Sequence, residues 1–315
     1  MAETAPTSAV AWGLVPAVGL LLVVAAALGY VFAVASRLAT SGWRTQSTVE
    51  PARSALRWLL QQRRTTLAAD RVLWRLGCAA VPVLAVLSLA VLPIGDRSLL
   101  STDADLVWFN AMEALLWAAV WLVGWGPNSL YPLVGGYRFL AQGLAYELPL
   151  MFSLITAGLA AGSLRTTDVV AAQSGLWFVV TMPLAFLVFV ASAAAFAFWG
   201  PFDAPAGADI AGGVLAELSS VDRLLVAAGR MMFLGATAAM AAALFLGGDA
   251  GPWLPGPIWQ LAKTVAVIAA VVVVGSRLPV LRPDRVVEVA WVVMVPATVA
   301  QALLVGVLLL AGVYR

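Results

Sequence analysis

Residues 10–35 read VAWGLVPAVGLLLVVAAALGYVFAVA, an apolar run without a charged side chain. A second long run, residues 286–313, contains Glu288 as its one charged residue. Runs of this length exceed the core helices of soluble domains and match a hydrocarbon layer ~30 Å thick. The alternation of polar and apolar residues that marks a membrane barrel is absent, so helices are the spanning elements. The sequence therefore predicts an all-α, polytopic membrane protein.

Composition supports this class and excludes several chemistries. Of 315 residues, 63% are hydrophobic and 11% are charged, whereas soluble domains carry about 25% charged residues. There is no histidine, and Cys78 is the single cysteine. A chain of this kind cannot supply a His-ligated haem, a serine triad or an iron–sulfur cluster. We therefore expect no metal site, no cofactor bound by this chain alone and no catalytic redox centre in it.

Apolar runs between charged residues or Pro/Gly breaks predict about eight spans. Their expected limits are 9–36, 72–92, 106–125, 144–163, 176–199, 224–246, 258–275 and 287–312. Residues 1–8 lack the positive charge that precedes a signal peptide's apolar run, so we interpret the first run as a retained span. No linker long enough for a soluble domain is evident, and residues 1–315 are expected to form a single membrane domain.

Arginine placement predicts the orientation. The loop after the first span carries Arg37, Arg44, Arg53, Arg57, Arg63, Arg64, Arg71 and Arg75, and the loop after the seventh carries Arg277, Arg282 and Arg285. The loop after the second span is net acidic, with Asp96, Asp103 and Asp105 against Arg97. The basic loops are expected in the cytoplasm. With eight spans, both termini then lie outside, in a bilayer that we expect to be a bacterial cytoplasmic membrane.

Within the first basic loop, residues 51–64 read PARSALRWLLQQRR. A helix here would place Ala52, Ala55, Trp58 and Leu59 on one face, with Arg53, Arg57 and Arg64 elsewhere. This pattern favours an amphipathic helix lying in the membrane interface, with the tryptophan toward the acyl chains. The alternative is an ordinary basic loop.

Charged residues inside spans cost a few kcal/mol each and point to function. Glu113 lies within the third span, Glu147 near the start of the fourth and Lys263 near the outer end of the seventh. Lys263 can also reach the surface along its own stem, and Glu147 can mark a helix start. Glu113, about two turns inside the span, is the hardest of the three to explain structurally.

The loop after the fifth span, residues 200–223, reads GPFDAPAGADIAGGVLAELSSVDR. Its acidic residues include Asp203, Asp209 and Glu217, although the basic loops predict that this face is cytoplasmic. It is either a solvated loop or a folded acidic funnel that conducts protons or docks a partner. Because burial brings carboxylates to titrate near neutral pH, a water-linked chain of them could carry protons.

Several blocks of sequence, in order, resemble the H-type membrane subunit of respiratory complex I and related energy-converting hydrogenases. Residues 124–131 read GWGPNSLY where that family has a pattern like GW-x-x-NS-x-Y, and residues 133–138 read LVGGYR, similar to LLG-x-x-R. The blocks at 146–147 (YE), 201–205 (PFDAP), 244–248 (LFLGG) and 278–284 (LPVLRPD) are similar to the family's SYE, PFDLPEAE, LFLGG and LPR-x-R-x-D. The resemblance runs from about residue 50 to the end of the chain.

The resemblance implies roles for particular residues. It implies proton coupling through Glu113, Glu147, Asp203, Asp209 and Glu217, with Lys263 as a further candidate on the path. It also implies a region that docks the peripheral arm or quinone, and the candidates there are Arg53, Arg57, Trp58, Arg138, Arg282, Asp284 and Arg285. Quinone, in this view, binds at the interface with peripheral subunits.

Departures from the family pattern fall in these same regions. The glycine–proline–asparagine element of the first loop is missing, and the acids after Pro205 are thinned to residues 206–208, AGA. Where the family has a glutamate in the sixth span, this chain has Arg230. These changes argue against ordinary quinone binding and favour a divergent member.

The leading hypothesis is a non-redox membrane subunit of a complex I-like NADH-quinone oxidoreductase. It would anchor the peripheral redox arm and couple electron transfer to proton translocation through buried carboxylates. Its partners would be the other membrane and peripheral subunits and the bilayer, and not nucleic acid. The alternatives are a subunit of a hydrogenase-like complex without quinone, a divergent scaffold subunit, and a stand-alone secondary transporter. No internal repeat of the kind expected for a transporter is evident.

Overall fold

The computed structural model describes residues 14–41, 45–93, 95 and 98–312. Every regular element in these ranges is helical. The α-helices are α1 (Leu14–Ser41), α2 (Thr45–Leu60), α3 (Arg71–Ser88), α4 (Asp105–Trp125), α5 (Leu130–Ala161), α6 (Thr166–Ala171), α7 (Phe178–Thr181), α8 (Pro183–Phe196), α9 (Ser220–Phe245), α10 (Gly256–Gly275), α11 (Pro283–Val289) and α12 (Val295–Leu310). Short helical turns are η1 (Leu89–Val91), η2 (Gly200–Phe202), η3 (Ala204–Ala206), η4 (Ala208–Ile210), η5 (Gly213–Leu215) and η6 (Ala290–Met294).

Seven of the described helices are long and apolar enough to cross a bilayer, and α8 is a shorter apolar helix. This confirms the all-α, polytopic membrane class. Four expected spans agree closely with α3, α4, α9 and α10. The eighth corresponds to α11, η6 and α12, which run continuously over Pro283–Leu310. The start of the first expected span at residue 9, together with Arg44, Asp96 and Arg97, lies outside the described residues.

The expected fifth span, residues 176–199, is not one continuous helix and divides into α7 and α8. Pro183 has no N–H to continue the ladder, and Met182 before it leaves the helical region with φ −136° and ψ 59°. The amide Nε2 of Gln301 in α12 donates 3.2 Å to the carbonyl of Thr181 at this break. A side chain from a neighbouring helix thus satisfies a backbone group that the break leaves free.

The fourth span is longer than expected. α5 covers 32 residues and begins at Leu130, not at residue 144. Its first turns contain Gly135 and Gly136, residues of a type that ordinarily weakens a helix. A Cβ on Gly135 would collide with the backbones of Pro205 and Val214. The glycine therefore allows this part of α5 to pack tightly on the loop of residues 197–219.

The helix expected over residues 51–64 is present as α2, but it runs from Thr45 to Leu60 and keeps Pro51 inside it. It ends early because the next residues are tied to the start of α9. The Gln61 side chain accepts from the Ser220 N–H, and the Ser219 hydroxyl accepts from the Arg64 N–H. Leu59, expected on the same apolar face as Ala52, Ala55 and Trp58, is 51% exposed, whereas those three are half-buried.

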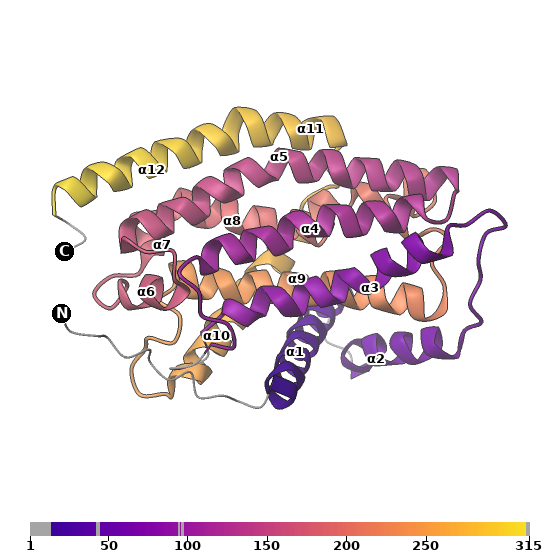
Figure 1. The fold of residues 1–315 in the computed structure, drawn as a ribbon, viewed down its shortest axis with the longest axis horizontal. Helices are drawn as coiled ribbons and strands as arrows, with labels where there is room; N and C mark the ends of the chain where they lie inside the picture. Colours follow the sequence, from indigo (N-terminus) through magenta and orange to yellow (C-terminus); the bar gives the residue numbers. More distant parts are fainter. Residues whose placement is uncertain (1–13, 42–44, 94, 96–97, 313–315) are drawn as a thin grey trace, which may run out of the picture.

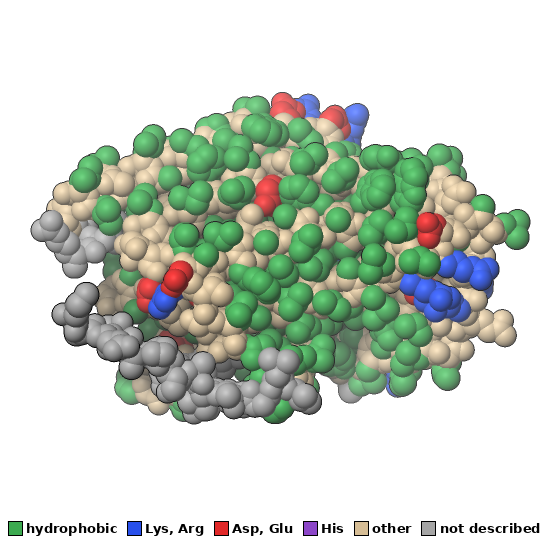
Figure 2. Space-filling model, viewed as in Figure 1, with side chains coloured by type: hydrophobic (Ala, Val, Ile, Leu, Met, Phe, Trp, Pro, Cys, Tyr) green, Lys and Arg blue, Asp and Glu red, His purple; other side chains and the backbone are tan. Residues whose placement is uncertain are grey.

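The centre of the bundle is α9, in which residues 232–245 are all buried. Small residues allow close helix crossings around it. A Cβ on Gly29 of α1 would meet the backbone of Met232, and a Cβ on Gly229 would meet Pro82 of α3. Figure 1 shows α12 lying along one edge, beside α5, and α1 crossing the bundle steeply. The outer surface that Figure 2 shows is predominantly apolar, as a lipid-facing surface requires.

Candidate functional site

The intramembrane carboxylates expected from sequence come together at the crossing of α4 and α5. Glu113 is fully buried, and neither of its carboxylate oxygens accepts a hydrogen bond among the described residues. Asn110, one turn earlier on the same face of α4, donates its Nδ2–H to Glu147 Oε1 of α5 at 2.8 Å. The two carboxylates interact electrostatically. We call Glu113 and Glu147 the carboxylate pair.

Polar atoms without partners continue around the carboxylate pair. The second oxygen of Glu147, the Asn110 carbonyl oxygen and the Tyr146 hydroxyl are all buried and unpaired in the described part of the chain. The Trp117 indole, whose N–H is equally unpaired, packs against Gly143 in the space that a Cβ there would need. Buried polar atoms rarely stay unsatisfied, so this cluster calls for water molecules or protons as additional partners.

Asp203 and Asp209 both lie in the loop of residues 197–219 but have different surroundings. Asp203 Oδ1 is 3.8 Å from Arg230 Nη1 of α9, beyond hydrogen-bond distance. Burial raises the pKa of Asp203, against the opposing effect of Arg230. Asp209 is exposed and pairs with Arg138 of α5 at 2.7 Å, and this hydrogen bond lowers the pKa of Asp209.

Glu217 accepts from the Ser129 hydroxyl at 3.0 Å, next to the turn between α4 and α5. Arg138 also donates to the carbonyl of Ala204 at 3.2 Å. The loop therefore folds over the first turns of α5 through polar contacts as well as through Gly135. The carboxylates of Asp203, Asp209 and Glu217 line one end of the bundle, separate from the carboxylate pair.

Lys263 lies at the opposite end of the bundle. Its ammonium donates to the carbonyls of Gly248 and Ala250 at 2.9 and 2.6 Å, in the connection between α9 and α10. It also sits 4.4 Å from the centre of the Trp177 ring. These contacts account for the charge locally. None of the described contacts joins Lys263 to the carboxylate pair.

The residues expected to meet quinone or a peripheral arm are spread over three elements. Arg53 and Arg57 are exposed on α2, and Arg57 pairs with Glu50 of the same helix. Arg282 and Asp284 form an exposed pair 3.4 Å apart at the start of α11, where Arg285 pairs with Glu288 at 2.5 Å. Arg138, by contrast, is partly buried under the loop of residues 197–219.

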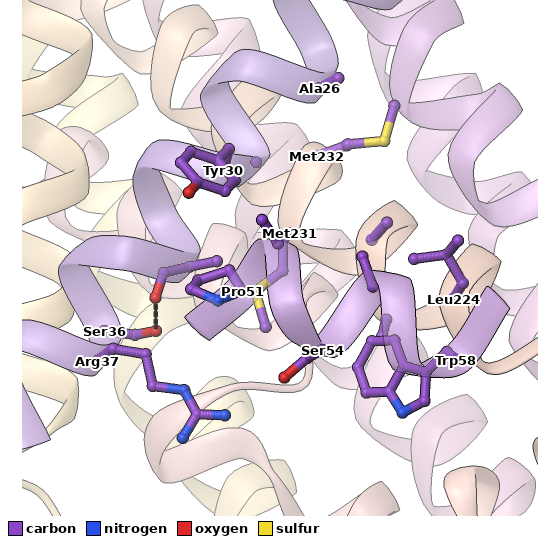
Figure 3. Close-up of a pocket in the computed structure, with 16 residues that line it drawn as sticks. Ala26, Tyr30, Ser36, Arg37, Pro51, Ser54, Trp58, Leu224, Met231 and Met232 are labelled. Carbon is purple, nitrogen blue, oxygen red and sulfur yellow. Dashed lines mark hydrogen bonds between the residues drawn. The ribbon is translucent and has the colours of Figure 1, made fainter. Parts of the chain in front are cut away.

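Trp58 lines a cavity of about 310 Å³ between α1, α2 and α9. Figure 3 shows Tyr30, Met231 and Met232 on its walls, with Ser36 and Arg37 from the end of α1 at one side. The lining is predominantly apolar with few polar groups, as is usual for sites that hold small organic molecules. The sequence indicated Trp58, but the residues from α1 and α9 required the helix packing.

Two further contacts were not expected. The carboxylate of Asp222 in α9 accepts two hydrogen bonds from Arg63, one of them 2.7 Å from Nε, and Asp222 raises the pKa of Arg63. This ion pair, buried on the Asp222 side and exposed on the Arg63 side, fixes the connection after α2 to the start of α9. Asn110 was likewise unforeseen, because an asparagine in an apolar run carries no charge to mark it.

Comparisons with known proteins agree with this architecture. The family described as NADH dehydrogenase matches residues 9–306. An H-type subunit of NADH-quinone oxidoreductase from Geobacter metallireducens is 34% identical over 273 residues, covering 83% of each chain. An H-type subunit of the same enzyme from Rhodopseudomonas palustris is 36% identical over 257 residues, covering 80% of each.

A solved structure, described as that of the membrane-bound sulfane sulfur reductase, an archaeal respiratory membrane complex, contains a chain with the same fold. The TM-score is 0.82, with coverage of 93% of this chain and 99% of that one, at 20% sequence identity. The resemblance drawn from the sequence blocks is confirmed by the family match and the H-type relatives. The chain is an integral membrane protein that belongs to the NADH dehydrogenase family, among its H-type members.

Proposed function

We propose that the chain is the membrane subunit of a complex I-like NADH-quinone oxidoreductase. It anchors the peripheral redox arm and couples electron transfer to proton translocation through the carboxylate pair. The observation that carries this proposal is Glu113: a fully buried carboxylate without a hydrogen-bond partner among the described residues, beside a second carboxylate, Glu147. The names of the H-type relatives supply the class of complex.

The carboxylate pair suits proton transfer because its free polar atoms form a short series. Tyr146, Glu147 and Asn110 each offer an unpaired buried oxygen near Glu113. Water molecules bridging these oxygens would connect the two carboxylates, so a proton could pass between α4 and α5. A change of charge in a partner subunit would shift the proton between them, since charges interact strongly in a dry interior.

The anchoring surface in this proposal is the end of the bundle where α3 begins. Figure 2 shows basic side chains gathered there. The exposed arginines of the connection after α2 and of the first turns of α3 are Arg63, Arg64, Arg71 and Arg75. A surface of one charge sign attracts acidic partner surfaces or anionic lipid. Orientation with this end in the cytoplasm and both termini outside is part of the proposal.

Quinone is the proposed ligand of the cavity between α1, α2 and α9. Its apolar walls, including Met231 and Met232, suit an isoprenoid tail, and Tyr30, Ser54 and Trp58 offer polar or aromatic contacts to a ring. Of the candidate residues named from sequence, only Trp58 lines this cavity. Three helices of this chain supply the walls of the site, and a peripheral subunit would complete it.

The membership of a complex is tested by purifying the tagged chain in mild detergent and identifying the proteins that accompany it by mass spectrometry. We expect iron–sulfur subunits and antiporter-like membrane subunits. An NADH-oxidising peripheral subunit supports the quinone reductase, and a hydrogenase-type large subunit in its place would favour the hydrogenase-like alternative. A monodisperse chain without partners would refute the subunit proposal and favour a stand-alone transporter.

A further inference from the structure

Arg230 holds a positive charge inside the bundle, close to Asp203 of the loop. It lies in α9, and its side chain is 13% exposed. Its Nε and Nη1 donate to no described residue, and the facing Oδ1 of Asp203 is equally unpaired, 3.8 Å from Nη1. An arginine remains protonated at all physiological pH values. The charge here is therefore permanent.

Four buried phenylalanines separate this charge from the carboxylate pair. They are Phe139, Phe196, Phe198 and Phe233, all fully or nearly fully buried, and we call them the aromatic group. The Arg230 guanidinium lies 4.8 Å from the centre of the Phe198 ring. The centres of the Phe198 and Phe139 rings are 5.4 Å apart. The aromatic group therefore begins directly against the guanidinium.

The same group ends at the carboxylate pair. Phe233 lies one turn after Arg230 on α9. The centres of the Phe233 and Phe196 rings are 6.1 Å apart, and those of the Phe196 and Tyr146 rings are 4.5 Å apart. Tyr146 immediately precedes Glu147 in α5. Phe139 and Tyr146 are two turns apart on that helix, so the apolar stretch is about 10 Å long. A proton moving from Asp203 to the carboxylate pair by this route would pass Arg230 and then the aromatic group.

The other charges around Arg230 do not cancel it. Arg223, two turns earlier on α9, adds a second positive charge that interacts with it. Arg138 is engaged with Asp209 and the carbonyl of Ala204. Asp203 is the one described carboxylate in ion-pair range of Arg230. The 3.8 Å between Asp203 Oδ1 and Arg230 Nη1 is too long for a hydrogen bond.

We propose that Arg230 and the aromatic group form a barrier to protons between Asp203 and the carboxylate pair. A fixed cation repels a proton carrier, and an apolar constriction excludes the water chain that would conduct it. The barrier keeps the membrane tight when no electrons flow. This inference rests on the proposed role of the carboxylate pair as the route for protons. Arg230 limits the movement of protons along that route and does not carry them.

The test is passive proton leak, which needs no electron donor. The purified complex is reconstituted into phospholipid vesicles containing the pH dye pyranine, and a potassium gradient with valinomycin drives protons inward. We expect wild type to be tight and R230K to leak less than R230Q, because a protonated lysine restores the positive charge. R230Q should raise the leak by about tenfold, which corresponds to a barrier lower by about 1.4 kcal/mol. R277Q, at an exposed arginine of the basic loop after α10, is the matched control and should not leak.

The double variant R230Q/E147Q identifies the route. If the leak of R230Q passes through the carboxylate pair, adding E147Q should return it to the wild-type level. A leak that persists in the double variant would overturn the barrier, because protons would then bypass Glu147. An equally tight R230Q, in a complex that elutes as wild type on size exclusion, would overturn it as well.

A second variant covers the case in which R230Q does not assemble. F196L keeps the charge and removes ring volume at the end of the aromatic group that contacts Tyr146, so it should leak more than wild type by severalfold, and E147Q should again suppress the leak. A tight F196L would refute the barrier. Failure of the barrier leaves the proposed function standing, since coupling by Glu147 is measured separately during electron transfer.

Discussion

At the scale of single residues, the sequence marked the charges in the spans but not their partners. Glu113 and Glu147 stood out because carboxylates are costly in a bilayer. Their proximity depends on the register between α4 and α5, to which Asn110 contributes with its 2.8 Å hydrogen bond. An uncharged asparagine gives no comparable signal. Arg230 differed from the family pattern, yet only the packing placed it against Phe198 and Asp203.

Lys263 provides a prediction at this scale. It is the only lysine of the chain, and its ammonium binds two carbonyls and a tryptophan face. K263M should leave both carbonyls short of a donor, at a cost of about 1–3 kcal/mol. We expect the Tm of the solubilised complex, followed by tryptophan fluorescence, to fall by a few degrees.

Coupling should nevertheless persist in K263M, because none of the described contacts joins Lys263 to the carboxylate pair. R285M, at an exposed arginine of α11, serves as the control for loss of a positive charge. Lost proton translocation in K263M with an unchanged Tm would instead place Lys263 on the proton route, as the sequence first suggested.

At the scale of elements, apolar run length predicted α3, α4, α9 and α10 well, because each is bounded by loops with charged residues, prolines or glycines. It failed where the break or the continuation depends on tertiary contacts. α5 begins at Leu130 because Gly135 fits the loop of residues 197–219, and the break before α8 is tolerated because Gln301 reaches the free carbonyl of Thr181. Neither contact is readable from a local window.

The ion pair of Arg63 with Asp222 gives a prediction for α2. Asp222 has a 5% exposed side chain and Arg63 a 36% exposed one. D222A should cost about 1–3 kcal/mol, less than the loss of a fully buried pair, because water screens Arg63. The connection after α2 should then open, and trypsin should cut after Arg63 and Arg64 several times faster than in wild type.

D284A, which removes an exposed ion pair at the start of α11, is the matched control and should not change this cleavage. Asp222 raises the pKa of Arg63 above its ordinary value, so the stabilisation carried by the arginine is fully present below that ordinary pKa and is lost only as pH rises through the raised one. The difference between D222A and wild type should therefore be the same at pH 6 and pH 8. Equal cleavage of both proteins would show that the pair does not hold the connection.

At the scale of the whole molecule, the long helices run back and forth, so the connections between them alternate between the two ends of the bundle. The connection between α10 and α11 lies at one end, and the segment between α6 and α7 lies at the other. Arginine placement predicts that the first end is cytoplasmic. Cys78 is the single cysteine of the chain and is buried. C78S therefore gives a background free of reactive thiols.

Single cysteines on that background test the orientation. Ser174 and Arg277 are both exposed and lie at opposite ends of the bundle. We expect S174C to react with a membrane-impermeant maleimide in intact cells and R277C to react only after permeabilisation. The reverse pattern would invert the orientation and place the basic surface outside.

The central claim is that the carboxylate pair couples electron transfer to proton movement, and the ratio of protons translocated to electrons transferred tests it most directly. The measurement uses the purified complex in sealed vesicles with NADH as donor, comparing wild type, E147Q and the exposed-site control E288Q. We predict that E147Q assembles, but that its ratio falls close to zero while E288Q keeps the wild-type ratio. A wild-type ratio in E147Q would contradict the account.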